Sequence, residues 1–205
     1  CCGYKGYLIK EYFKNYSLHL SDVTFDIYKN NISVHKKRAE NWKVTLVDTG
    51  ENSMTGGRLG RLKEYLKNED AFCFTYGDGV SDVNIKHLID FHRKHGKEAT
   101  LTAAFPPGRF GAIKIKNNTV TSFEEKPKGD GAYVNAGFFV LSPKVFNRIN
   151  SDKTIWENQP LKDLSNENQL MAYKHNGFWQ PMDNIRDKNH LQELWEKEKA
   201  PWKVW

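Results

Sequence analysis

The segment from Ala71 to Val80 constrains this chain most, because a short apolar stretch runs directly into a carboxylate held between two glycines. Residues 71–76 are mostly aromatic or β-favouring and end at a turn signal, which predicts a buried strand. In an open α/β sheet, ligands bind beyond the carboxyl ends of the strands, so Asp78 is expected at the edge of a crevice. Gly77 and Gly79 would let the backbone and a ligand approach closely.

A carboxylate in this position suits Mg2+, which prefers oxygen ligands and often bridges to substrate phosphates. Asp and Gly are also ordinary turn residues, so a simple turn explains the sequence Gly77-Asp78-Gly79 equally well. The segment alone leaves both interpretations open.

The size and composition of the chain predict one ordinary folded domain. The 205 residues are 39% hydrophobic and 27% charged, and no apolar run is long enough to cross a membrane. The three cysteines, Cys1, Cys2 and Cys73, have no metal-ligand spacing, and Cys73 is expected to be buried in its strand. These features, together with the lack of a visible signal peptide, favour the reducing cytoplasm.

The net charge of +6 is compatible with an anionic substrate. No Arg-rich tract or helix-turn-helix pattern supports a nucleic-acid partner. The chain opens on Cys1 and Cys2 without a Met or a polar lead-in, which suggests a strand that has been cut.

Hydrophobic spacing and turn signals predict an alternation of helices and strands. Helices are expected at 7–16, 57–68, 82–95, 143–149, 156–164 and 183–199. Strands are expected at 23–27, 32–35, 42–47, 71–76, 99–105, 112–116, 119–123, 133–141 and 170–174. Ser81 is expected to cap the helix at 82–95, and Gly96 to end it.

Two of these strands flank the helix at 82–95, which is the βαβ pattern of a parallel sheet. The predicted fold class is α/β: a Rossmann-like, mixed, mostly parallel sheet with flanking helices and β-hairpin insertions. A single domain over residues 1–205 is the simplest organisation.

Several polar residues stand at strand ends or breaks and are candidates for a site. Arg109 follows a Pro-Pro-Gly break, although on its own a surface loop charge is the better explanation for it. Glu125 and Lys126 end a strand, and Pro127 restricts Lys126 to extended geometry. A solvated ion pair is the alternative for these two residues.

Asn135 lies inside an apolar strand, where a buried amide needs a partner such as a sugar hydroxyl. Gly137 weakens that strand unless a ligand or another backbone comes close. Asp183 precedes the last helix and either caps it or joins Asp78 in holding a metal. The segment Thr55-Gly56-Gly57 opens a helix whose N–H groups could face an anion or a polar ring.

Taken together, these segments closely resemble the sugar-nucleotide pyrophosphorylases, a family of nucleotidyltransferases. The strand-end Asp78, Glu125-Lys126-Pro127 and Asn135-Ala136-Gly137 mark the wider family. The segments Phe105–Gly111 and Trp179–Asp183 point to the branch of cytidylyltransferases that act on glucose 1-phosphate. The resemblance covers essentially the whole chain and includes Cys2–Tyr7, Val47–Gly50, Met54–Arg58 and Ala200–Lys203.

The resemblance implies that CTP and α-D-glucose 1-phosphate react to give CDP-glucose and pyrophosphate. It places Mg2+ on Asp78 and Asp183, the sugar phosphate on Lys126, and a further substrate contact on Gly77. It places the remaining substrate contacts on Arg109, Gly111, Glu125, Asn135 and Gly137, and the base near Thr55, Gly56 and Gly57. It also implies a homo-oligomer.

Three other functions remain open from the sequence. A glycosyltransferase that uses a nucleotide-sugar donor would also carry metal-binding Asp residues at a strand end, in this case Asp78 and Asp82. Another pyrophosphorylase would use UTP or dTTP in place of CTP. A non-catalytic sugar-nucleotide-binding module is the alternative from a different class.

The family's first strand and its loop of the type Gly-Gly-x-Gly-Thr-Arg-Leu have no counterpart in this sequence. Because that loop cradles the triphosphate, we expect the chain alone to turn over poorly or not at all. Placing the family's Gly-rich segment in front of the chain, a form called the completed protein below, should restore activity. Formation of CDP-glucose by the chain alone at an ordinary enzymatic rate would contradict this.

Overall fold

The computed structural model describes residues 1–106, 112–124 and 132–205. Two compact units make up the chain. The first unit contains residues 1–65 and 146–160, and the second contains residues 66–145 and 161–205. Each unit has its own elements and is described by itself.

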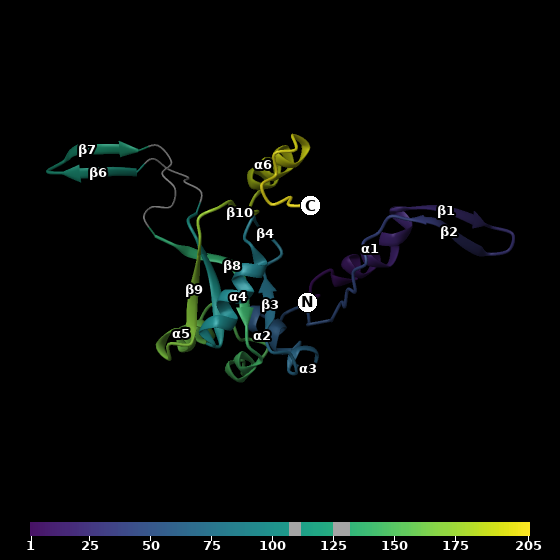
Figure 1. The fold of residues 1–205 in the computed structure, drawn as a ribbon, viewed down its shortest axis with the longest axis horizontal. Coiled ribbons are helices and arrows are strands. Elements are labelled where there is room, and N and C mark those ends of the chain that lie inside the picture. Colours follow the sequence, from purple (N-terminus) through teal and green to yellow (C-terminus); the bar gives the residue numbers. More distant parts are fainter. Residues whose placement is uncertain (107–111, 125–131) are drawn as a thin grey trace. The chain divides into compact units, whose positions relative to one another are not determined.

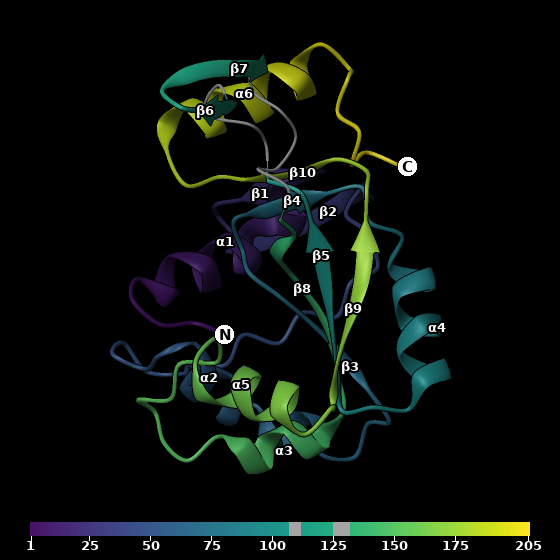
Figure 2. The ribbon, with the colours of Figure 1, turned by 90° about the vertical axis from the view of Figure 1, so that its left-hand side faces the viewer.

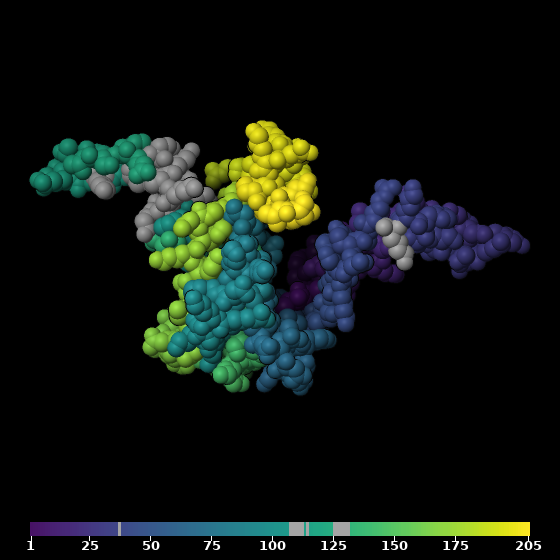
Figure 3. Space-filling view, viewed as in Figure 1, coloured from purple at the N-terminus to yellow at the C-terminus, as the bar shows by residue number. Residues whose placement is uncertain are grey.

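The first unit begins with the helix α1 (Gly6–His19), followed by the hairpin of β1 (Ser21–Asp26) and β2 (Asn31–Lys37) (Figure 1). The predicted helix at 7–16 and the predicted hairpin are therefore confirmed. Asn30 takes the left-handed backbone that a tight turn needs, with φ of 48°. Figure 3 shows this hairpin as a slender projection, which fits the exposure of its apolar side chains Phe25, Ile27 and Tyr28.

The predicted strand at 42–47 is wrong. Only one parallel bridge forms in this part of the first unit, between Cys2 and Asp48. Trp42 instead stacks on Tyr16 of α1, with 5.8 Å between the ring centroids. Because the segment pairs with a single residue, it has no ladder to hold it in strand geometry.

The predicted helix at 57–68 is divided into α2 (Thr55–Gly60) and α3 (Lys63–Leu66). Glycine is a poor helix former, and Gly60 ends α2. Arg61 follows and binds the carboxylate of Asp152 through two nitrogens, at 3.0 and 2.6 Å. This pair is exposed, and the hydrogen bond from Arg61 lowers the pKa of Asp152 below its usual range.

The second unit contains a four-stranded sheet in the order β3-β8-β5-β9 (Figure 2). Its strands are β3 (Phe72–Thr75), β8 (Val134–Leu141), β5 (Ala99–Ala104) and β9 (Leu170–His175). β5 runs parallel to β9, and both β3 and β5 run antiparallel to β8. The helix α4 (Ile85–His95) links β3 to β5, so the predicted βαβ unit is confirmed, with β8 between its strands.

The core of the second unit lies where α4 contacts β5, β8 and β9. Leu88, Ala99, Phe139, Val140 and Leu141 are all almost fully buried. β3 is different, because it is an edge strand whose residues alternate between half-buried and exposed. The predicted burial of Cys73 is therefore wrong, since that side chain faces solvent.

The starts of α4 and of the last helix, α6 (Ile185–Glu196), are set by Asn side chains. The N-cap of α4 is Asn84, whose Oδ1 accepts from the backbone N–H of His87, so the prediction of Ser81 as the cap is wrong. Gly96 ends α4 as predicted, with φ of 65°. Asn184 caps α6 by accepting from the N–H groups of Arg186 and Asp187.

The remaining elements are a second hairpin, a short 3-10 helix and one more α-helix. They are β6 (Ala112–Lys116), β7 (Thr119–Glu124), η1 (Pro143–Arg148) and α5 (Gln159–Asn166). Asn117 and Asn118 form the turn of the hairpin with positive φ, as predicted. Among the described helices, none has the length and apolar character that a bilayer crossing requires.

A buried hydrogen-bond chain joins the end of α4 to β5. The backbone N–H of Lys97 donates to Nδ1 of His95, so neutral His95 carries its proton on Nε2 and donates it to Oγ1 of Thr100. The Thr100 hydroxyl then donates to Nδ1 of His92. Burial, assisted by the nearby charges of His95 and Arg93, lowers the pKa of His92 to about 4.

This chain of bonds predicts acid lability. Unfolded His92 takes up a proton as the pH falls through 6.5, whereas the folded form stays neutral until about pH 4. The contribution of neutral His92 to the free energy of unfolding is therefore fully present above pH 6.5. It is lost as the pH falls from 6.5 to 4, and the total loss is at most about 3 kcal/mol.

Urea unfolding at pH 7.5 and pH 4.5 measures this loss, and His92→Gln should reduce it by roughly half or more. His87→Gln, on the exposed side of α4, is the matched control. An equal loss of stability in the wild type and in His92→Gln would contradict the assignment.

Candidate active site

A short two-stranded ribbon brings the backbone segments of the two predicted metal ligands side by side. β4 (Gly79–Ser81) pairs antiparallel with β10 (Trp179–Pro181), and the sequence patterns predicted neither strand. Just beyond the ladder, the backbone N–H of Met182 donates to the carbonyl of Asp78 at 2.8 Å. Asp78 and Asp183, which are 105 positions apart in the sequence, therefore lie on neighbouring backbone segments.

The carboxylates on these segments fit a hard divalent ion. Asp78 and Asp183 are both exposed, and a Cβ added at Gly77 would meet nothing within 4 Å, so there is open space at the residue before Asp78. Within the described residues there is no group of three or more His, Cys, Asp or Glu that could hold a metal. A pair of carboxylates is nevertheless the donor set that Mg2+ uses when substrate phosphates complete its shell.

Asp183 does not cap α6, because Asn184 does so. The simple structural explanation that the sequence allowed for Asp183 is therefore wrong.

Asn135 and Gly137 have local partners in β8. The N–H of Gly137 donates to Oδ1 of Asn135 at 2.9 Å, so the amide nitrogen of Asn135 is its donor to any substrate. Gly137 has φ of 78°, and a Cβ there would come within 2.5 Å of the ring of Tyr76. Tyr76 immediately precedes Gly77 and Asp78, so Gly137 lets the end of β3 pack closely on β8.

Asp82 is engaged elsewhere and does not fit a metal pair with Asp78. Its Oδ1 accepts from the N–H of Phe178 at 2.7 Å and lies 2.9 Å from Nε2 of His175. The same nitrogen is 3.2 Å from Oγ of Ser81. A nucleophilic triad needs the acid and the serine on different ring nitrogens, so this cluster does not activate Ser81.

The glycines of α2 have a packing role in the first unit. A Cβ on Gly56 would come within 2.9 Å of the carbonyl oxygen of Thr154, and one on Gly57 would collide with the backbone of Asp152. The N–H of Gly57 donates to the Thr154 carbonyl, and the Thr55 hydroxyl donates to Glu157. The start of α2 is thus closely packed against residues 152–157.

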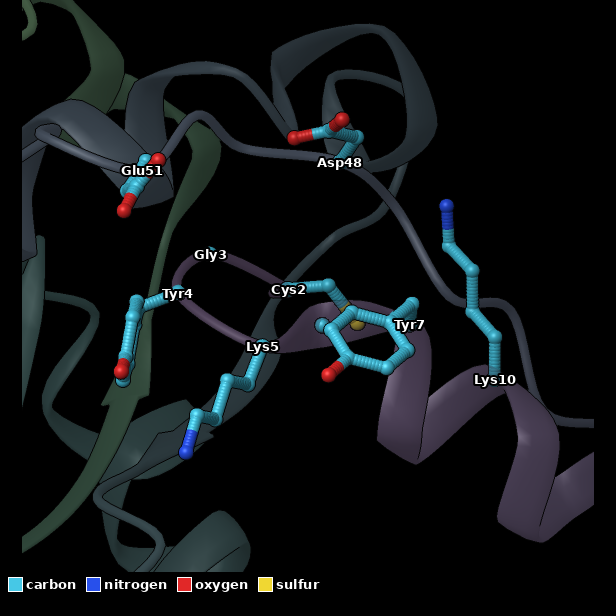
Figure 4. Close-up of a pocket in the computed structure, with 9 residues that line it drawn as sticks. Cys2, Gly3, Tyr4, Lys5, Tyr7, Lys10, Asp48 and Glu51 are labelled. Carbon is cyan, nitrogen blue, oxygen red and sulfur yellow. The ribbon is translucent and has the colours of Figure 1, made fainter.

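The first unit also has a cavity of about 520 Å³ beyond the Cys2–Asp48 bridge (Figure 4). Tyr4 and Lys5 come from the loop before α1, and Tyr7 and Lys10 from α1. Asp48 is part of the bridge itself, and Glu51 follows it. The backbone of Lys5 has φ of 53°, a left-handed conformation that residues other than glycine rarely adopt. Such conformations are often found at functional sites. The sequence patterns did not predict this cavity, and its mixture of ammonium and carboxylate groups suits a polar ligand.

Four predicted substrate residues fall outside the described part of the chain. They are Arg109, Gly111, Glu125 and Lys126.

Comparison with known proteins defines the family. Residues 21–185 match the family described as "Nucleotidyl transferase". The chain belongs to the nucleotidyltransferase family. This confirms the resemblance found from the sequence motifs, and it makes the chain part of an enzyme family.

Two relatives of these nucleotidyltransferases match along nearly the whole chain. The chain is 64% identical to "Glucose-1-phosphate cytidylyltransferase" of Salmonella typhimurium (strain LT2), over 100% of this chain and 80% of that protein. It is 37% identical to "Probable glucose-1-phosphate cytidylyltransferase" of Bacillus subtilis (strain 168), over 99% of this chain and 79% of that protein.

The fold also matches solved structures. HddC from Yersinia pseudotuberculosis complexed with GMP-PN aligns with a TM-score of 0.62 at 18% identity, over 94% of this chain and 76% of that one. This likeness confirms the predicted mixed α/β fold class.

The contact between Gly137 and Tyr76 predicts the effect of two glycine substitutions. Gly137→Ala should destabilise the second unit by about 1 to 3 kcal/mol, because the new methyl group meets the Tyr76 ring in a left-handed backbone. Gly77→Ala should leave the unfolding free energy nearly unchanged, since open space surrounds it. Urea unfolding measures both, and equal effects would contradict the account of this contact.

Proposed function

We propose that the enzyme transfers a cytidylyl group from CTP to α-D-glucose 1-phosphate and releases pyrophosphate. The observation that carries this proposal is the 64% identity to the Salmonella relative over the whole chain. The pairing of the Asp78 and Asp183 segments supports it, because it supplies carboxylates where a metal-bound nucleotide would need them.

In this reaction, an oxygen of the sugar phosphate attacks the α-phosphorus of CTP. The bond to the β-phosphate breaks, and its electron pair leaves with pyrophosphate. The attacking phosphate is already ionised, so no side chain has to remove a proton. Positioning and charge neutralisation are then the main catalytic tasks.

We assign these tasks to the residues that the sequence singled out. Asp78 and Asp183 would hold Mg2+, which when bound neutralises charge on the nucleotide phosphates. Asn135 would donate its amide N–H groups to a sugar hydroxyl, with Gly137 beside it.

The other assignments follow from the family resemblance. Lys126 would pair with the sugar phosphate, and Glu125 would bind sugar hydroxyls. Arg109 and Gly111 would contact the substrate, and Thr55, Gly56 and Gly57 would lie near the base. The homo-oligomer expected from the resemblance and a cytoplasmic location also stay predictions.

A glycosyltransferase is the second candidate from the sequence, and the structure supports it less. That function needs Asp82 beside Asp78 on a metal, but Asp82 is bound to His175 and Phe178. The two functions also differ in their products, since a glycosyltransferase releases no pyrophosphate from CTP and glucose 1-phosphate.

Pyrophosphate release by the completed protein with glucose 1-phosphate tests the proposal directly. CTP should support release at least tenfold faster than UTP or dTTP, and Mg2+ should be required. Equal rates with all three nucleotides would contradict the assignment to cytidine, and no release with any of them would contradict the reaction.

The role of the carboxylate pair is tested separately by Asp78→Asn and Asp183→Asn. Each should lower kcat by at least 100-fold while the melting temperature changes little, because both side chains are exposed. Asp90→Asn, on the exposed side of α4, is the matched control. Unchanged turnover in Asp78→Asn would remove that residue from the mechanism.

A further inference from the structure

A compact polar cluster closes one end of the β4–β10 ribbon. The Nε2–H of His175 faces three acceptors: Oδ1 of Asp82 at 2.9 Å, the carbonyl of Phe178 at 3.1 Å and Oγ of Ser81 at 3.2 Å. The Ser81 hydroxyl donates to the same Phe178 carbonyl at 2.8 Å. The backbone N–H of Phe178 donates to Asp82, so the cluster joins the residues that follow β4 to the residue that precedes β10.

The cluster fits closely and is partly shielded from water. The side chain of His175 is only 11% exposed, and that of Asp82 is 31% exposed. Gly177 has no space for a side chain, because a Cβ there would collide with Asp82 and come within 2.7 Å of Cε1 of His175. Partial burial makes each of these hydrogen bonds stronger than it would be at an open surface.

The opposite end of the same ribbon holds the candidate metal ligands. Three residue pairs separate the two ends, from Trp179–Ser81 at the cluster to Pro181–Gly79 beside Asp78. A two-stranded ribbon of this length is marginally stable without further support. Apart from the cluster, the support includes a hydrogen bond from the indole of Trp179 to the carbonyl of Ala136 in β8.

We propose that His175 and Asp82, assisted by Ser81 and closed by Gly177, form a clamp that fixes the register of the ribbon and so holds the Asp78 and Asp183 segments together. The clamp residues are positioning residues for the divalent ion, and this role rests on the function proposed above. The clamp would act through the β4–β10 ladder, since its own carboxylate is occupied by His175 and Phe178.

The test compares His175→Ala, His175→Gln and Gly177→Ala in the completed protein with His87→Ala as the control. Manganese binding in the presence of CTP, followed by electron paramagnetic resonance, gives the affinity for the ion. Amide exchange at Met182 reports the far end of the ribbon without any metal. Melting temperature and the KM for glucose 1-phosphate are measured alongside.

We expect His175→Ala and Gly177→Ala to weaken Mn2+ binding about tenfold and to speed exchange at Met182, with the KM for glucose 1-phosphate within twofold of wild type. His175→Gln keeps an N–H donor and should recover part of both effects. It also replaces His175→Ala if that variant does not fold. His87→Ala should match the wild type.

A lower melting temperature with unchanged Mn2+ affinity would overturn the clamp proposal, because the cluster would then serve stability alone. Asp78→Asn separates this failure from failure of the proposed function. If Asp78→Asn weakens Mn2+ binding and the clamp variants do not, only the clamp is wrong. If Asp78→Asn also leaves the affinity unchanged, the metal site itself is wrong.

Discussion

The antiparallel pairing of β4 with β10 is the interaction on which the candidate site depends. Two segments about 100 residues apart in the sequence meet in a ladder of only three residue pairs. The bond from the Met182 N–H to the Asp78 carbonyl continues that ladder to the point where both carboxylates leave the backbone. Without the β4–β10 pairing, Asp78 would lie on a turn after an edge strand and Asp183 just before a helix, with nothing to bring the two segments together.

The surrounding sheet gives this ribbon a fixed support. β8 pairs with both β3 and β5, and the left-handed Gly137 lets Tyr76 pack against it. Tyr76 leads directly into Gly77 and Asp78, while the Trp179 indole ties β10 to the same strand. The glycine in β8 therefore has a structural reason that is independent of any ligand. This packing role is compatible with a place beside the substrate, because glycine has no side chain to obstruct either one.

The sequence predicted well those elements whose signals are local. The β1–β2 and β6–β7 hairpins, the strand β5 and the βαβ unit followed from turn residues and hydrophobic runs. The two shortest strands, which depend on distant partners, were not found. The strands β4 and β10 are three residues each, too short for a periodic pattern, and the segment at 42–47 had β-favouring residues but only one residue to pair with.

In the candidate site, too, features with a local sequence signal were predicted and features that depend on distant residues were not. Asp78 was predicted from a strand followed by glycines, which is a local pattern. The engagement of Asp82 by His175 could not be predicted, because it depends on a residue 93 positions away in the sequence, at the end of β9. Nor could the sequence distinguish Asp183 from Asn184 as the helix cap, since both residue types favour that position and they are adjacent.

The central claim is that Asp78 and Asp183 share one divalent ion on the nucleotide phosphates. Anomalous diffraction from crystals of the completed protein grown with Mn2+ and CTP tests it most directly. The account predicts a single manganese peak at about 2.1 Å from a carboxylate oxygen of each residue and in contact with a phosphate oxygen. A peak bound to only one of the two carboxylates, or to neither, would contradict it.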